Sequence, residues 1–173
     1  MSCNTLESAL SSELILHAHD KETIQQLILN GADINYQSQE GWCLLFELVS
    51  LGLDQHILAL TDTLLDIHIT DSKGRTALFW AIHHEYPEVI ETLLHLGYDT
   101  TQPVTDVLPA LHYAVYKDNT FILNLLLEHK LDIEAEDKYH HTALSYAYHY
   151  KREEMIKLLK QRGACTPKLD YEM

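Results

Sequence analysis

Basic side chains are scarce in this sequence. Its 173 residues include 12 lysines and arginines against 26 aspartates and glutamates, which gives a formal net charge of −14 at pH 7. Nucleic-acid binding and docking on an anionic membrane both require clustered lysine and arginine. The composition therefore argues against both kinds of partner, and it either favours a basic protein partner or simply keeps the protein soluble. The charge is also uneven, because residues 1–136 carry 21 acidic and 5 basic side chains and residues 137–173 carry 5 and 7.

Long apolar runs are absent as well. No segment approaches the roughly 18 consecutive apolar residues of a membrane span. The N-terminal sequence MSCNTLESAL has neither the basic region nor the long apolar core of a signal peptide. We therefore expect a cytoplasmic protein that does not enter a membrane.

Motifs for catalysis, metal binding or cofactor binding are also lacking. The three cysteines, Cys3, Cys43 and Cys165, are far apart, so they suggest neither a disulfide framework nor a zinc site. The twelve histidines form no HExxH motif, and adjacent histidines such as those at 83–84 and 140–141 point apart on a helix. No GxSxG motif and no glycine-rich phosphate loop occur. The sequence predicts no enzyme, no metal site and no cofactor, and we expect Cys43 to be half-buried and unreactive.

What the sequence does contain is an internal repeat. Asp33, Asp66, Asp99 and Asp132 recur at one constant interval along the chain, which we call the repeat period. Each repeat holds two short segments with helical spacing of apolar residues, followed by a polar lead-in to the next copy. The period predicts a single domain over residues 1–173, with repeats at about 5–37, 38–70, 71–103, 104–136 and 137–165 and a loose tail at 166–173.

The six glycines follow the same period. They fall at three repeat positions: Gly41 and Gly74 in the opening turn, Gly52 between the helices, and Gly31, Gly97 and Gly163 after the second helix. These are positions where the backbone is expected to need a positive φ. Leu64 replaces the last of these glycines in the second repeat, so we expect its second helix to be short or distorted. Thr76 and Thr142 are placed to cap helices.

The third repeat carries the clearest motif. It reads GRTAL over residues 74–78, then Ala81, EVI over 88–90, LL over 93–94 and GYD over 97–99. In these features the chain resembles the ankyrin-repeat family over about residues 5–165. The resemblance implies an all-α solenoid of about five helix-turn-helix repeats with protruding hairpin-like loops. It also implies that His112, in the tetrapeptide PALH at 109–112, ties adjacent loops by a hydrogen bond.

Stacked repeats leave a preformed concave face, which lowers the ordering cost of binding. The resemblance implies that loop tips and first-helix ends point to this face. The predicted protein-binding residues are Glu40, Trp42, Leu51, Lys73, Arg75, His83, His84, Asp106, Leu108, Tyr116, Tyr139 and Tyr150. Tryptophan, tyrosine and arginine dominate interface energetics. Packing of some of these aromatics against the next loop is the alternative.

Three functional hypotheses follow. The first is a protein-binding module that acts without catalysis, as a stoichiometric inhibitor or immunity-type protein for a basic partner. The second is a structural adaptor subunit of a larger complex. A metal-dependent sensor or enzyme is a third, which the lack of motifs disfavours.

Overall fold

The computed structural model describes the backbone of residues 3–166 and the side chains from Glu7 onward. It divides the chain into two compact units, unit 1, which ends at Tyr98, and unit 2, which begins at Asp99. Most of the expected tail at 166–173 lies outside the described residues. The single-domain assignment stays a prediction.

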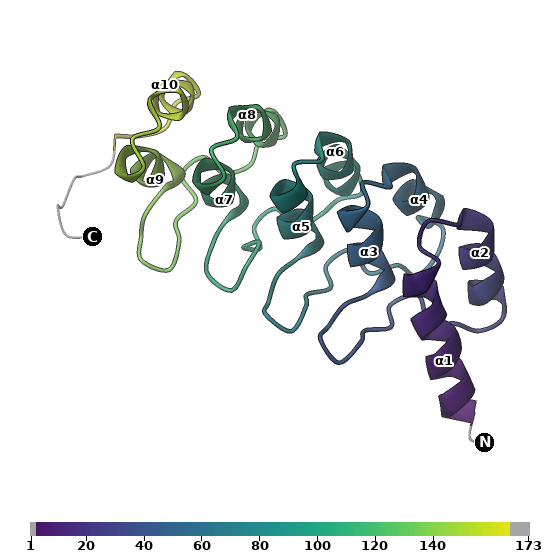
Figure 1. The fold of residues 1–173 in the computed structure, drawn as a ribbon. Coiled ribbons are helices and arrows are strands. Elements are labelled where there is room, and N and C mark those ends of the chain that lie inside the picture. Colours follow the sequence, from purple (N-terminus) through teal and green to yellow (C-terminus); the bar gives the residue numbers. More distant parts are fainter. Residues whose placement is uncertain (1–2, 167–173) are drawn as a thin grey trace. The chain divides into compact units, whose positions relative to one another are not determined.

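Unit 1 contains three antiparallel helix pairs (Figure 1). Its helices are α1 (Cys3–Leu16), α2 (Lys21–Leu29), α3 (Leu44–Ser50), α4 (Asp54–Ala59), α5 (Ala77–His84) and α6 (Pro87–His95). Within each pair the two helices contact each other, and α3 also contacts α1 and α5 while α4 contacts α6. First helices therefore stack on first helices, and second helices on second helices.

Unit 2 repeats this arrangement with two helix pairs (Figure 1). Its helices are α7 (Ala110–Tyr116), α8 (Thr120–Glu128), α9 (Ala143–His149) and α10 (Glu153–Gln161). The contacts α7–α9 and α8–α10 stack the second pair on the first. The described residues form no sheet, since their extended pairing is limited to isolated bridges at Thr70–Thr76 and Glu136–Thr142.

The core follows the apolar spacing of the sequence. Leu45, Leu48, Leu78 and Ile82 are fully buried in unit 1, on the inner faces of α3 and α5. In unit 2 the corresponding buried residues are Leu111, Val115, Leu144 and Ala147. A buried leucine or isoleucine contributes roughly 1.5–3 kcal/mol relative to an exposed one. No pair could bury its apolar face alone, so the stacking of pairs within each unit provides its stability.

Helix starts use the caps that the sequence predicts. The Thr76 hydroxyl accepts a hydrogen bond from the Phe79 amide at 3.2 Å, and the Thr142 hydroxyl accepts one from the Ser145 amide at 3.4 Å. Each cap satisfies one of the amides that the first helical turn leaves without a partner.

A tight hairpin precedes each of four first helices, at 38–42, 71–75, 104–108 and 137–141. Each hairpin is closed by a backbone hydrogen bond from its first amide to its last carbonyl, at 2.8–2.9 Å. The first residues, which occupy the same repeat position, are Ser38, Asp71, Val104 and Asp137. Side-chain oxygens of Ser38, Asp71 and Asp137 accept further amide hydrogen bonds inside the hairpin. Val104 has no such oxygen, and the neighbouring Thr105 hydroxyl accepts from the Val107 and Leu108 amides instead.

The link between the two helices of a repeat adopts a left-handed backbone in four successive repeats. Gly52 has φ +70°, and Glu85, Asp118 and Lys151, at the same position of the following repeats, have φ of 61°, 59° and 55°. A non-glycine residue in this region costs roughly 1–2 kcal/mol. The stacked helices therefore impose the conformation even where glycine is missing.

The predicted irregularity in the second repeat is confirmed. Helix α4 is six residues long, whereas α2, α6, α8 and α10 have nine each. A turn follows it up to Leu64, whose side chain is 89% exposed.

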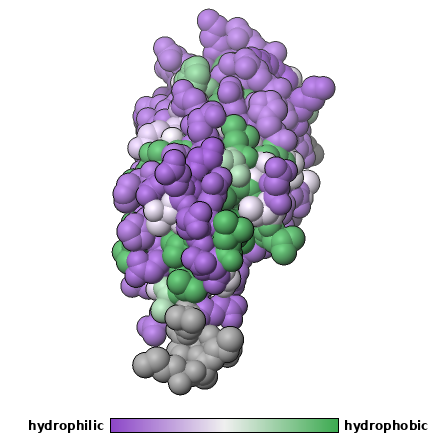
Figure 2. Space-filling view, turned by 90° about the vertical axis from the view of Figure 1, so that its right-hand side faces the viewer, coloured by the Kyte–Doolittle hydropathy of each residue, from purple (hydrophilic) through white to green (hydrophobic). Residues whose placement is uncertain are grey.

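The surface on the side of α1 and α2 is mainly hydrophilic, with separate hydrophobic spots (Figure 2). Among the described residues, no helix combines the length and the apolar character that crossing a bilayer requires.

Candidate functional site

The hairpins of both units hold their tips rigidly. The Asp71 side chain is 1% exposed. Its Oδ1 accepts from the amides of Lys73 and Arg75 at 2.8 and 2.9 Å, and its Oδ2 accepts from Arg75 Nε at 2.7 Å. A buried carboxylate that accepts several hydrogen bonds fixes the backbone around it. Lys73 is thereby left exposed at the tip while the Arg75 side chain turns toward α5.

An aromatic cluster in unit 1 receives this arginine. The Arg75 guanidinium carbon lies 4.3 Å from the centre of the Trp80 ring, and the Trp42 and Trp80 rings are 5.0 Å apart, edge to face. Trp42 also contacts Phe46 and donates its indole N–H to Glu47 Oε2 at 2.8 Å. Trp42 is therefore half-buried, and it packs on helices α3 and α5 and not on the next loop, which was the expected alternative to a contact role.

The two histidines predicted for this face lie at the end of α5, and both are exposed. His84 stacks on Trp80 with ring centres 6.0 Å apart, and His83 stacks on Phe79 at 5.6 Å. Among the side chains that the structure describes, no three metal-ligating groups converge on a point. The two histidines extend the aromatic surface of Trp80.

Trp80 is a residue that the sequence reasoning missed. It lies one helical turn before His83 and His84, so side chains at i, i+3 and i+4 share its face. The same position of the other repeats holds Glu47, Tyr113 and Tyr146. Large side chains recurring at this position were the signal that could have identified it.

Unit 2 presents a different surface, made of tyrosines. Tyr116, Tyr139 and Tyr150 are 55%, 63% and 38% exposed. The Tyr116 and Tyr150 rings pack edge to face at 5.9 Å, and Tyr150 also contacts Tyr146 at 6.1 Å. The Lys138 ammonium lies 4.9 Å from the Tyr139 ring centre. The predicted aromatics of unit 2 are therefore open to solvent, unlike Trp42.

A buried polar network supports the tyrosines. Asp137 accepts from the Tyr139 and His141 amides and from the Tyr146 hydroxyl at 2.8–2.9 Å. Burial works to raise the pKa of Asp137, but these hydrogen bonds outweigh it and the pKa lies below the usual 3.8. Burial beside this carboxylate raises the pKa of Tyr146, so its hydroxyl remains a donor.

His112 joins α7 to the next hairpin. Its Nε2 donates to the His141 carbonyl at 2.7 Å, which confirms the predicted tie between loops. The side chain is fully buried, and this burial lowers the pKa of His112 below 6.5. The imidazole is therefore neutral at pH 7.

The remaining predicted residues are divided between the units. Glu40 and Leu51 in unit 1 and Asp106 in unit 2 are exposed, and Leu108 is half-buried. The predicted set is thus divided between the two units.

The cysteine expected to be half-buried is in fact fully buried. Cys43 is 1% exposed at the start of α3, because it occupies a core-facing cap position. Burial raises the pKa of its thiol to about 11. A thiol that remains protonated at neutral pH is a poor nucleophile.

Comparisons with known proteins match this architecture. A family model described as ankyrin repeats in three copies matches residues 14–104 and 100–170. An ankyrin repeat protein of Acanthamoeba polyphaga mimivirus is 27% identical over 160 residues, which cover 87% of this chain and 20% of that protein. A potassium channel of Arabidopsis thaliana is 30% identical over 115 residues, covering 66% of this chain and 14% of the channel.

The chain thus spans about a fifth or less of the length of these relatives. The family model covers far more than half of the chain, and the paired helices and hairpins recur with the repeat period of the sequence. The expected fold class, an all-α repeat solenoid, is confirmed. The chain therefore belongs to the ankyrin-repeat family, whose repeats are protein–protein interaction modules.

Proposed function

We propose that this protein binds another protein, without catalysis, through the hairpin tips and first-helix ends of its repeats. The observation that carries the proposal is the exposure of Tyr116, Tyr139 and Tyr150 beside a hydrogen-bonded network that is centred on buried Asp137. Tyrosine offers a large contact area at a low cost in conformational entropy. Exposed aromatics held in place before binding are well suited to be anchors.

The charge distribution favours a basic partner. Unit 1 carries 14 acidic and 3 basic side chains, and unit 2 carries 12 and 9. Long-range attraction between an acidic and a basic protein accelerates encounter and weakens with salt. A small acidic protein that captures a basic enzyme would act as its stoichiometric inhibitor, as an immunity protein does. We expect it to act in the cytoplasm.

The alternative role is that of a structural adaptor. The observation that favours it is the short share of each relative that the chain matches, 20% of the mimivirus protein and 14% of the plant channel. In those proteins the similar segment is one part of a larger chain. Co-purification with several proteins at fixed stoichiometry, with no loss of any partner's activity, would favour this role.

The test compares variants of exposed aromatics on two surfaces. Affinity capture from the producing cells, followed by mass spectrometry, would identify the partner, and calorimetry would measure its binding. We expect the double substitution Tyr116→Ala and Tyr150→Ala to weaken binding by about 2 kcal/mol or more, because interface tyrosines are frequent anchors. The matched control is Phe121→Ala, since Phe121 is 65% exposed on the second helix α8.

Equal loss in the control and the double variant would place the contact elsewhere. A captured partner that is acidic, or whose binding does not weaken with added salt, would contradict the electrostatic part of the proposal. Both variants should keep the wild-type melting temperature, because the replaced rings are exposed.

A further inference from the structure

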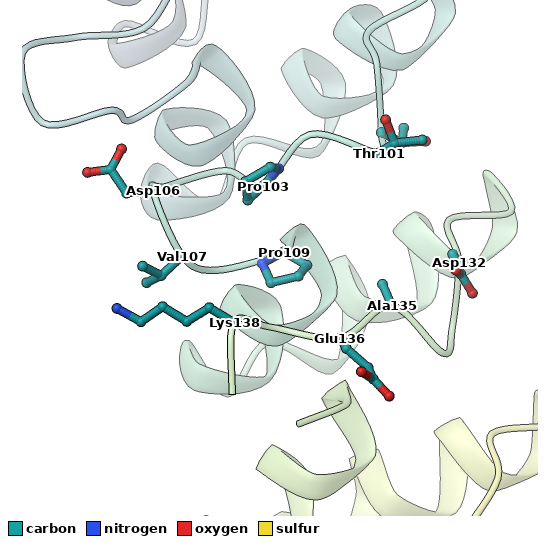
Figure 3. Close-up of a pocket in the computed structure, with 10 residues that line it drawn as sticks. Thr101, Pro103, Asp106, Val107, Pro109, Asp132, Ala135, Glu136 and Lys138 are labelled. Carbon is teal, nitrogen blue, oxygen red and sulfur yellow. The ribbon is translucent and has the colours of Figure 1, made fainter. Parts of the chain in front are cut away.

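A groove lies between the two hairpins of unit 2. It encloses about 350 Å³ and has a mixed lining of apolar and acidic side chains. Pro103, Pro109 and Ala135 surround its middle in Figure 3. Asp132 lies at one end and Asp106 at the other, and the Glu136 carboxylate points away from Pro103 and Pro109. This volume is at the small end of the range typical of ligand pockets.

The equivalent space in unit 1 is closed. Gln37 Nε2 donates to the carbonyls of Gly41 and Thr70, at 2.9 and 2.7 Å, and so links one hairpin to the next. The Ser72 amide also donates to the Glu40 carbonyl across this contact at 3.3 Å. The backbones approach so closely that a Cβ on Gly41 would lie 2.4 Å from the Ser72 nitrogen.

Two substitutions at the equivalent positions of unit 2 remove this closure. Pro103 occupies the repeat position of Gln37, two repeats later, and has no side-chain amide with which to link the hairpins. Val107 occupies the repeat position of Gly41, and its side chain prevents the close approach that a glycine permits. Pro103 and Val107 both line the groove. The opening is therefore a consequence of the sequence of these hairpins.

The charges of the groove favour a cation at one end. Its lining includes three carboxylates, Asp106, Asp132 and Glu136, and one ammonium group, Lys138. Lys138 lies toward the Asp106 end in Figure 3 and over the Tyr139 ring. The other end has Asp132, one oxygen of which accepts from the Glu134 amide, and Glu136, which pairs with exposed His140 at 2.8 Å. The negative charge of this end therefore comes from two carboxylate groups, those of Asp132 and Glu136.

We infer that this groove binds an arginine side chain of the protein partner, an inference that rests on the proposed function. The aliphatic part of the arginine lies along Pro103, Pro109 and Ala135. Its guanidinium group interacts with Asp132, and Glu136 adds negative charge at the same end. Arginine suits the groove better than lysine, because a guanidinium is planar, weakly hydrated and able to pack on apolar walls while it donates to carboxylates.

The probe is N-acetyl-arginine N-methylamide, titrated into the full chain and followed by two-dimensional amide NMR. We expect shifts concentrated in residues 99–109 and 132–138. The citrulline analogue has the same shape without the charge and should bind at least roughly threefold more weakly.

The double variant Asp132→Asn with Glu136→Gln should reduce arginine binding roughly fivefold, since exposed ion pairs contribute modestly. Asparagine at 132 retains an acceptor for the Glu134 amide.

Two control variants distinguish arginine binding in the groove from non-specific attraction to an acidic protein. Glu88→Gln with Glu91→Gln removes two exposed charges from α6 in unit 1 and should leave arginine binding unchanged. Pro103→Gln introduces the residue that links the hairpins in unit 1, leaves the charge unchanged and should abolish binding. The melting temperature of each variant shows that it is folded.

Shifts spread over all acidic surfaces, equal binding of arginine and citrulline, or equal losses in the two double variants would overturn the inference. Its failure is distinguishable from that of the proposed function. If Tyr116→Ala with Tyr150→Ala weakens partner binding while the groove variants do not, the tyrosine surface is retained and the groove is rejected.

Discussion

The two units build the same helix pairs with different interior chemistry. The tetrapeptide PALH at 109–112 has counterparts in the other repeats, and in unit 1 its last position holds Phe46 and Phe79, both buried among aromatic rings. Unit 2 has the equally buried His112 there, which bonds to the next hairpin, and the half-buried Ser145. Aromatic packing stabilises this position in unit 1, and the hydrogen bond of His112 stabilises it in unit 2. The comparison teaches that a repeat position can keep its burial while its chemistry changes.

The two units also differ at their surfaces. Unit 1 closes its hairpin contact with Gln37 and covers Trp80 with Arg75 and His84. Unit 2 leaves a groove at the equivalent contact and exposes its tyrosines. Preformed, uncovered surface needs less rearrangement before it binds. We therefore expect unit 2 to contribute more of the binding energy than unit 1.

The largest expected effect comes from Phe46→Ala. Phe46 is fully buried in unit 1, and truncation of such a ring costs about 3–5 kcal/mol. Both tryptophans, Trp42 and Trp80, lie in unit 1, so their fluorescence reports unfolding of that unit. In urea, the fluorescence midpoint of the variant should fall below the midpoint measured by helical circular dichroism.

The control for this prediction is Phe121→Ala, which should change the free energy of unfolding by less than about 0.5 kcal/mol because its ring is exposed. Coincident midpoints for Phe46→Ala would mean that the two units unfold together, which would weaken the comparison.

An intermediate effect is expected at the link between helices. Gly52 in unit 1 and Lys151 in unit 2 occupy the same repeat position with positive φ. Gly52→Ala should lower the free energy of unfolding by roughly 1–2 kcal/mol, because alanine is strained there. Lys151→Gly should raise it by about 1 kcal/mol, because glycine relieves that strain at the cost of greater freedom in the unfolded chain. Urea unfolding measures both, and changes of the same sign would show that strain does not control this position.

The smallest expected effect depends on pH. Because burial lowers the pKa of His112, the unfolded chain takes up a proton there below pH 6.5 that the folded chain does not. The stabilisation from this site is fully present above about pH 6.5 and is lost as the pH falls toward the folded pKa. Relative to His112→Gln, which keeps an N–H donor but does not titrate, the wild type should lose about 1 kcal/mol between about pH 7.5 and about pH 5.5.

Paired urea titrations of the two proteins at both pH values measure this difference. A parallel loss in wild type and variant would assign the pH dependence to other groups. The unit 1 equivalents, Phe46 and Phe79, do not titrate, so the difference should appear in the unfolding of unit 2.

The fold could be predicted from the sequence because the same repeat period recurs along nearly the whole chain. Helix pairs, threonine caps and the short α4 follow from residues that recur, or fail to recur, at that period. The non-glycine left-handed residues Glu85, Asp118 and Lys151 could not be predicted, because nothing in their side chains requires that conformation. It arises from the packing of the helices on either side.

The candidate site was less predictable. Exposure of Tyr116, Tyr139 and Tyr150 agrees with the expected face, but the partial burial of Trp42 and the contribution of Trp80 depend on ring contacts between repeats. The groove exists because unit 2 lacks the hydrogen bonds that join two hairpins in unit 1. A repeat pattern shows which residues recur, and it does not show which contacts are lost where a residue differs. The importance of Pro103 and Val107 became clear only when they were compared with Gln37 and Gly41, which occupy the same repeat positions in unit 1.

The link made by Gln37 has one more consequence. Its amide belongs to the lead-in of one hairpin and bonds to the carbonyl of Thr70, which leads into the next. The first two repeats are thus matched to each other, and moving either one to another place in the chain would separate this donor from its acceptors even if every residue were kept. The order of the copies along this chain is itself a structural requirement, so shuffled versions with the same composition should be less stable than the natural arrangement.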